Sequence, residues 1–155
     1  MPKISAGVLL YRVRGGELEF LLAHPGGPFW EQRDLGAWTI PKGEVQAGEP
    51  PFAAACREFE EEIGFRPEGE FIELNPIVQK SGKIVHAWAV AGNCDPNHIR
   101  SNLFKMEWPP GSGQYQQCPE VDRAGFFRLA DARKKINPAQ IPLLEELRRK
   151  IELGS

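Results

Sequence analysis

The sequence is poor in the residue patterns that mark several common classes of protein. Its three cysteines, Cys56, Cys94 and Cys118, are odd in number and form no C-x-x-C pair. This usage fits a reducing compartment, and it predicts a cytoplasmic location. The three histidines are widely separated and lack the spacing of metal ligands, so no histidine site is predicted.

Long apolar runs and excess charge of one sign are also missing. No apolar run approaches the roughly twenty residues that a membrane helix needs, and the N-terminus leads into a strand-like segment rather than a signal peptide. The formal net charge is −2 and the pI is about 6.0. Such a balance gives no reason to expect a nucleic-acid or anionic-membrane surface. The expected partner is a small molecule.

Length and local pattern predict one α/β domain over residues 1–155, since no polar tract is long enough to be a linker. Apolar, β-rich segments predict strands at 4–13, 18–23, 38–40, 71–79, 84–91 and 124–128, with a further candidate at 103–108 inside a turn-rich region. Helices are expected over 51–63, 130–136 and 139–153. Strands on both sides of the first helix, with the last helix left to cover the opposite face, predict a three-layer α/β/α sandwich with a mixed sheet.

The helix at 51–63 is defined by its own sequence. Pro51 stands where a first turn tolerates proline, and Gly64 supplies a left-handed stop. At about 100° per residue, one narrow stripe is apolar and is predicted to pack inward. It consists of Phe52, Cys56, Phe59 and Ile63.

Three glutamates, Glu58, Glu61 and Glu62, converge on another face of this helix. Like charges at these spacings repel by a few tenths of a kcal/mol per pair, and the helix C-terminus is already partly negative. A divalent cation removes both penalties, and oxygen ligands favour Mg²⁺ first and Mn²⁺ second. Mg²⁺ also prefers substrate phosphates, so a phosphorylated ligand is expected. The alternative is a glutamate-rich face that is merely solvated.

The spacing around these glutamates resembles the Nudix box, G-x5-E-x7-R-E-U-x-E-E-x-G-U with U a bulky apolar residue. Residues 43–65 match it at every specified position. These positions are Gly43, Glu49, Arg57, Glu58, Phe59, Glu61, Glu62, Gly64 and Phe65. In Nudix hydrolases the box binds Mg²⁺ or Mn²⁺ and cleaves a nucleoside diphosphate linked to another group, and the expected fold is likewise the α/β Nudix sandwich.

The resemblance implies roles for individual residues. Glu58, Glu61 and Glu62 would be the metal carboxylates, and the main-chain carbonyl of Lys42 would be a further ligand. Arg57 would orient the neighbouring glutamates through charge-assisted hydrogen bonds.

The resemblance also points outside the box. In several Nudix enzymes a glutamate in the loop before the last strand deprotonates the attacking water or binds an extra metal. Glu120 resembles that position, and Asp122 is the second choice. If neither acts, Glu61 or Glu62 would be the base, while Glu49 would brace the box loop against the helix.

Substrate recognition leaves more than one interpretation open. Lys42, Trp38 and Trp108 are candidates for contacts with phosphate and base, although packing is the more common role of such tryptophans and a solvated or ion-paired role is as good an explanation for Lys42. The Pro41-Lys42-Gly43 run resembles the P-K-G of dinucleoside or inositol polyphosphate hydrolases, and Ser81 stands where ADP-ribose pyrophosphatases tend to have proline. The resemblance therefore favours a nucleotide or dinucleoside polyphosphate. An ADP-ribose or nucleotide-sugar pyrophosphatase, and a binding module without catalysis, remain alternatives. Dimers are common in this family, so a homodimer is an open expectation.

Overall fold

A mixed sheet forms the middle layer of the computed structural model, which describes residues 3–154. Its strands follow the order β4-β5-β1-β2-β8, and the short β3 pairs with β1 beside β2. β1 and β5 run parallel, whereas the other pairs are antiparallel. The strands are β1 (Ile4–Arg14), β2 (Glu17–Pro25), β3 (Lys42–Glu44), β4 (Phe71–Val78), β5 (Ile84–Ala91) and β8 (Val121–Arg128).

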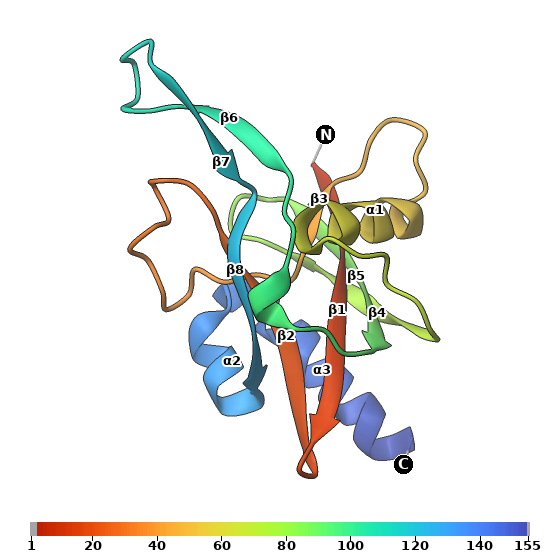
Figure 1. Ribbon diagram of the computed structural model, residues 1–155. Coiled ribbons are helices and arrows are strands. Elements are labelled where there is room, and N and C mark those ends of the chain that lie inside the picture. Colours follow the sequence, from red (N-terminus) through yellow and green to blue (C-terminus); the bar gives the residue numbers. More distant parts are fainter. Residues whose placement is uncertain (1–2, 155) are drawn as a thin grey trace.

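Helices cover both faces of the sheet. Helix α1 (Pro51–Ile63) lies on one face, and α2 (Leu129–Lys135) and α3 (Ile141–Gly154) lie on the other (Figure 1). Two short 3-10 helices occur at Pro96–His98 and Pro138–Gln140. A separate ribbon of β6 (Leu103–Glu107) and β7 (Tyr115–Pro119) projects beyond the sheet (Figure 1). The predicted three-layer α/β/α sandwich with a mixed sheet is confirmed.

The central strand β1 shows why the sheet needs a helix on each side. Ala6, Val8 and Leu10 are buried in the core under α1, whereas Leu9 and Tyr11 are buried in the core under α3. Successive side chains of a strand point to opposite faces, so a strand that is covered on both faces is apolar at every position. This explains the unbroken apolar run near the start of the sequence.

Three element predictions need correction. Residues 38–40 make only isolated bridges, from Trp38 to Ile136 and from Thr39 to Ala23, rather than a strand. The turn-rich region contains a second strand, β7, and the last strand begins at Val121 rather than Ala124. Strand β7 reads Tyr-Gln-Gln-Cys-Pro, which is mostly polar because it pairs only with β6 and covers little core.

Helix α1 has the predicted bounds, but its inward face is rotated from the predicted stripe. Its last residue is followed by Gly64 at φ 104°, whose N–H donates to the carbonyl of Glu60. Phe59 and Ile63 are buried, and Ala54 and Ala55 join them in the core. Phe52 is 39% exposed and contacts Phe71 and Trp88 edge to face, so its predicted core position is wrong. Small alanines allow the helix to lie closer to the sheet there.

Across residues 3–154, none of the helices combines the length and apolar character needed to cross a membrane.

Candidate active site

Three carboxylates meet where α1 ends and β8 begins. Glu58 and Glu61 come from α1, and Glu120 comes from the junction between β7 and β8. One oxygen of each lies within 4.8 Å of the others. Oxygen ligands at this separation suit a hard divalent cation, since Mg²⁺ and Mn²⁺ bind carboxylates and retain waters.

The arrangement differs from the predicted trio of Glu58, Glu61 and Glu62. Glu62 is only 8% exposed and lies beside the group of Glu58, Glu61 and Glu120 rather than in it. The helical wheel gives the direction of a side chain but not its depth. Residue 62 lies on the edge of α1 that faces the sheet, so its carboxyl is buried near Lys42.

Burial and repulsion raise the pKa of three carboxyl groups in and beside the cluster, those of Glu58, Glu62 and Glu120. Burial raises the pKa of Glu62 well above its ordinary value, and the charges of Glu58 and Glu120 raise it further, against the opposing charge of Lys42. Burial followed by the charge of Glu61 raises the pKa of Glu58. Burial and then Glu58 raise the pKa of Glu120. The site is therefore short of positive charge.

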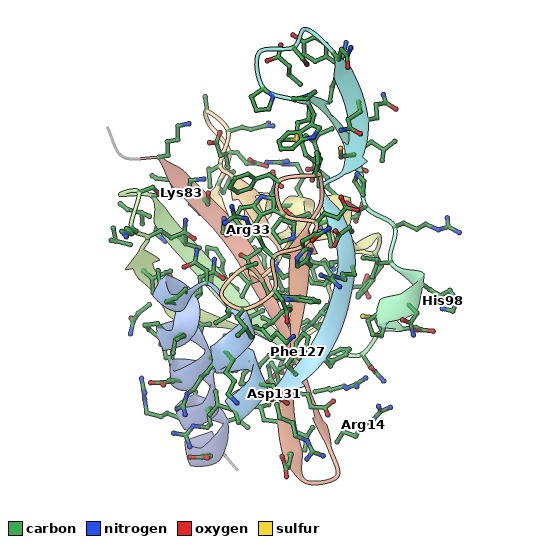
Figure 2. All side chains as sticks on the ribbon, turned by 90° about the vertical axis from the view of Figure 1, so that its left-hand side faces the viewer. Arg14, Arg33, Lys83, His98, Phe127 and Asp131 are labelled. Carbon is green, nitrogen blue, oxygen red and sulfur yellow. The ribbon has the colours of Figure 1, made fainter. Side chains whose placement is uncertain are left out.

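Lys42 is placed where its own charge is also disfavoured. Burial lowers the pKa of its ammonium, and the charge of Lys83 lowers it further, while Glu62 and Glu58 act in the opposite direction. Figure 2 shows Lys83 toward the end of the sheet that lies away from Arg14.

Arg57 connects the helix to the loop that precedes it. Its Nη1 donates to Glu58 at 2.9 Å and to Glu61 at 3.1 Å. Its Nε and Nη2 donate to the two carboxylate oxygens of Glu49 at 2.8 and 3.0 Å, and Nη2 also donates to the carbonyl of Glu44. The hydrogen bonds to Glu49 make the largest contribution to raising the pKa of Arg57. One guanidinium thus aligns two cluster glutamates with the box loop.

Gly43 provides the space for Glu58. A Cβ at residue 43 would collide with the carboxylate of Glu58, although the backbone there has no positive φ. The glycine is therefore required by this close approach and not by backbone conformation.

A backbone bridge holds Glu120 beside α1. The N–H of Asn102 donates to the carbonyl of Glu61 at 2.7 Å, and the carbonyl of Asn102 accepts the N–H of Glu120 at 2.8 Å. The N–H of Gly26 then donates to the carbonyl of Glu120 at 3.0 Å. Residue 120 is thereby fixed from both sides by groups far away in the sequence.

Side chains reinforce this bridge. The hydroxyl of Ser101 accepts the N–H of Val121 at 2.9 Å and donates to the carbonyl of Asn102 at 3.1 Å. A Cβ at Gly26 would collide with the carbonyl oxygen of Pro119, so only glycine allows strand β2 to approach there. These contacts could not be predicted from the sequence, because backbone groups make most of them.

Asp122, the second choice for the base, is engaged elsewhere. Its carboxylate lies 2.8 Å from Nδ1 of His24, a fully buried side chain whose Nε2 donates to the carbonyl of Arg33 at 2.6 Å. Figure 2 shows Arg33 in the loop that follows β2. This histidine therefore links β2, β8 and that loop, a contact that the sequence did not predict.

The two tryptophans proposed for substrate contact are not placed alike. Trp38 is 5% exposed, packs edge to face against Phe127 in the core under α3, and donates its indole N–H to Asp34. It lies on the opposite side of the sheet from α1, so the substrate role predicted for Trp38 is not supported. Trp108 follows β6 and is partly exposed near the end of the β6–β7 ribbon.

The fold, the glutamate cluster and the intact box together define one family. The model of the NUDIX domain matches residues 1–147, and the chain belongs to this family.

Two known proteins are similar in sequence to parts of the chain that differ in length. An octanoyltransferase from Myxococcus xanthus is 35% identical over 109 residues, which are 70% of this chain and 26% of that protein. An RNA pyrophosphohydrolase from Rhodospirillum rubrum is 43% identical over 68 residues, or 42% of this chain and 39% of that protein. The chain thus spans well under half the length of these two relatives.

A solved structure resembles the whole chain. A C. elegans Ap4A hydrolase binary complex superposes with a TM-score of 0.66 at 25% identity, covering 97% of this chain and 99% of that one.

Proposed function

We propose that this protein is a Mg²⁺-dependent hydrolase that cleaves the pyrophosphate linkage of a nucleotide or dinucleoside polyphosphate, with Mn²⁺ as a substitute ion. The observation that carries the proposal is the convergence of Glu58, Glu61 and Glu120, aligned by Arg57, in an intact Nudix box. The family, an RNA pyrophosphohydrolase among the relatives and an Ap4A hydrolase among the structures support it.

The donor set fits the ion. Glu58 and Glu61 would hold it, with the carbonyl of Lys42, and Glu62 would support them from its buried position. When bound, the ion supplies a charge that neutralises phosphoryl oxygens and lowers the pKa of a coordinated water.

Glu120 is the proposed proton acceptor. Its raised pKa makes its carboxylate a stronger base than an exposed glutamate, which favours removal of a proton from water near neutral pH. Arg57 keeps Glu58 and Glu61 in place and touches no substrate in this scheme.

A substrate panel tests the activity. Purified protein with Mg²⁺ is assayed against diadenosine tetraphosphate, nucleoside triphosphates, ADP-ribose and a nucleotide sugar, with coupled phosphate detection. Turnover of the first two classes is expected to exceed that of the others. No turnover of any substrate would instead favour the binding module.

Matched variants test the roles. Glu61→Gln should lose most turnover, since it removes ligand charge with little change in shape, and Glu120→Gln should lower kcat. Glu70→Gln, an exposed glutamate outside the cluster, is the control. Full turnover in Glu61→Gln would refute the metal assignment, and an unchanged kcat in Glu120→Gln would transfer the base to the box.

The organisation of the protein is also proposed rather than established. One domain over residues 1–155 fits the match to residues 1–147. The free thiols of Cys56, Cys94 and Cys118 support a cytoplasmic location. A homodimer stays a prediction, and light scattering after gel filtration would test it.

A further inference from the structure

A pocket of about 570 Å³ opens on the outer face of α1, beside the carboxylate cluster. Glu61 belongs to both the pocket and the cluster, and Arg57 in the pocket wall donates to Glu58 and Glu61, so the two are continuous. Phe52 lies toward the start of the helix, and Arg66 and Asn102 come from segments beyond its end. Ligand pockets for small molecules commonly have volumes of roughly 300–1,000 Å³.

Arg66 provides a positive charge that is not paired with a carboxylate of the described residues. Its side chain is exposed and has no hydrogen bond or ion pair with any residue in the range 3–154. Burial raises the pKa of the Cys56 thiol in the pocket wall, and the charge of Arg66 opposes this shift, which places the guanidinium near the pocket. Arg57, in contrast, is fully engaged by carboxylates. A phosphate oxygen would therefore bind Arg66 first.

Phe52 provides an aromatic surface at the other end of the pocket. Its ring is held edge to face by Phe71 and Trp88, with centroids 4.8 and 5.3 Å away, yet it remains 39% exposed. A fixed and exposed ring is suited to stacking against a nucleobase.

Asn102 adds a hydrogen-bonding group with a fixed backbone. Its main chain bridges Glu61 and Glu120, while its exposed side-chain amide makes no hydrogen bond within the described residues. An amide offers both donors and an acceptor, as the edge of a base requires.

We propose that this pocket binds the second nucleoside of a dinucleoside polyphosphate, with its adjoining phosphate on Arg66 and its base beside Phe52. The inference rests on the proposed function, since it places the cleaved linkage at the cluster of Glu58, Glu61 and Glu120. It makes the pocket a specificity site, because a mononucleoside triphosphate has no second nucleoside to place there.

The test compares diadenosine tetraphosphate with ATP on the intact protein. Arg66→Gln should lower the ratio of kcat/KM for diadenosine tetraphosphate to that for ATP by about tenfold, the effect of losing one charged contact. Arg66→Lys should recover part of this ratio, since the charge returns without the planar fork. Arg149→Gln, an exposed arginine on α3, should leave the ratio unchanged.

A second variant fills the pocket instead of removing a charge. Ala53 is exposed on α1 and lines the pocket, so Ala53→Trp should exclude the second nucleoside and lower the same ratio. Arg149→Trp places the same side chain on α3 as the control, and thermal unfolding checks that each variant is folded.

The outcomes separate this inference from the proposed function. If the wild-type protein hydrolyses both substrates while Arg66→Gln and Ala53→Trp keep its ratio, the pocket assignment is overturned and the activity stands. If the wild-type protein hydrolyses neither substrate, the proposed function fails first, and binding of diadenosine tetraphosphate weakened by Arg66→Gln in calorimetry would still support the pocket. Equal binding by both proteins would overturn it.

Discussion

Replacing Gly43 with alanine should damage the proposed metal site without damaging the fold. The backbone at this position has no positive φ, so alanine brings no conformational strain. The new Cβ would, however, lie 2.5 Å from Oε1 of Glu58 and closer still to its carboxyl carbon, whereas Cβ contacts are rarely shorter than 3.4 Å. The carboxylate must therefore move by about 1 Å or more, and misplacement on this scale commonly costs about 100-fold in rate.

The cost to stability should be small, because the displaced atoms are at the end of a flexible side chain. We expect the free energy of unfolding without metal to fall by less than about 1 kcal/mol. Gly7→Ala is the matched contrast. Its Cβ would lie 2.5 Å from the carbonyl oxygen of Pro41 and 2.6 Å from the Cβ of Lys42, which cannot withdraw, so a loss of about 1–3 kcal/mol is expected.

Three measurements check the prediction for Gly43→Ala. Mn²⁺ affinity by electron paramagnetic resonance should fall about 10- to 100-fold, and turnover about 100-fold, while chemical denaturation without metal stays near wild type. Wild-type Mn²⁺ affinity in this variant would show that Glu58 does not need the space above Gly43. The reasoning about this close approach would then be wrong.

Three further predictions concern the charge and support of the same cluster. A raised pKa in the folded state means that the folded protein binds protons more tightly than the unfolded one, so the metal-free protein should lose stability as pH rises above about 4.5. Glu62→Gln should make the free energy of unfolding less dependent on pH. At pH 7 this variant should be more stable than the wild-type protein by roughly 1–3 kcal/mol, the usual cost of an uncompensated buried polar group. Lower stability of the variant at pH 7 in urea denaturation would contradict this prediction. Because a cation must displace these protons, Mn²⁺ should bind more tightly at pH 8 than at pH 6, and calorimetry in buffers of different ionisation enthalpy should detect proton release; identical heats in all buffers would exclude the coupling. Ser101→Ala removes the acceptor for the N–H of Val121 and should cost about 1–2 kcal/mol while lowering kcat more than it raises KM; an effect on KM alone would argue against a role in placing Glu120.

The parts of the fold that the sequence predicted are those whose signals are local. Pro51 and Gly64 mark the ends of α1 within the helix itself, and the structure places the ends at these residues. Strand β1 could be identified because both of its faces are buried and its middle part, from Ala6 to Tyr11, contains no charged residue. Strand β7 escaped prediction, since Tyr115 to Pro119 is held by its backbone ladder to β6 rather than by an apolar face.

In the candidate site, too, the residues with a local signal could be predicted and those placed by distant contacts could not. Glu58 and Glu61 follow from helical spacing, but Glu120 was suggested only by likeness to a family, and its place beside them depends on distant backbone bonds. The bridge through Asn102 joins residues 61 and 120 by backbone hydrogen bonds, which do not depend on the identity of a side chain and so cannot be inferred from the sequence. The depth of Glu62 was also unpredictable, because its carboxyl is buried beside Lys42, a residue of β3 rather than of its own helix.

The charges of the site connect two properties, the lower stability of the metal-free protein and the expected affinity for a divalent cation. Glu58, Glu62 and Glu120 each have a raised pKa, so each is held where its charged form is disfavoured. Arg57 donates hydrogen bonds of 2.8 to 3.1 Å to carboxylate oxygens. Two of these bonds go to Glu49 in the loop, so the guanidinium is shared between the loop and the cluster glutamates. A divalent cation would supply the missing charge where Arg57 does not reach. Binding of the ion would remove the repulsion that destabilises the metal-free protein, and this relief would contribute to metal affinity. The backbone bridge to Glu120 keeps the carboxylates from moving apart before the ion binds.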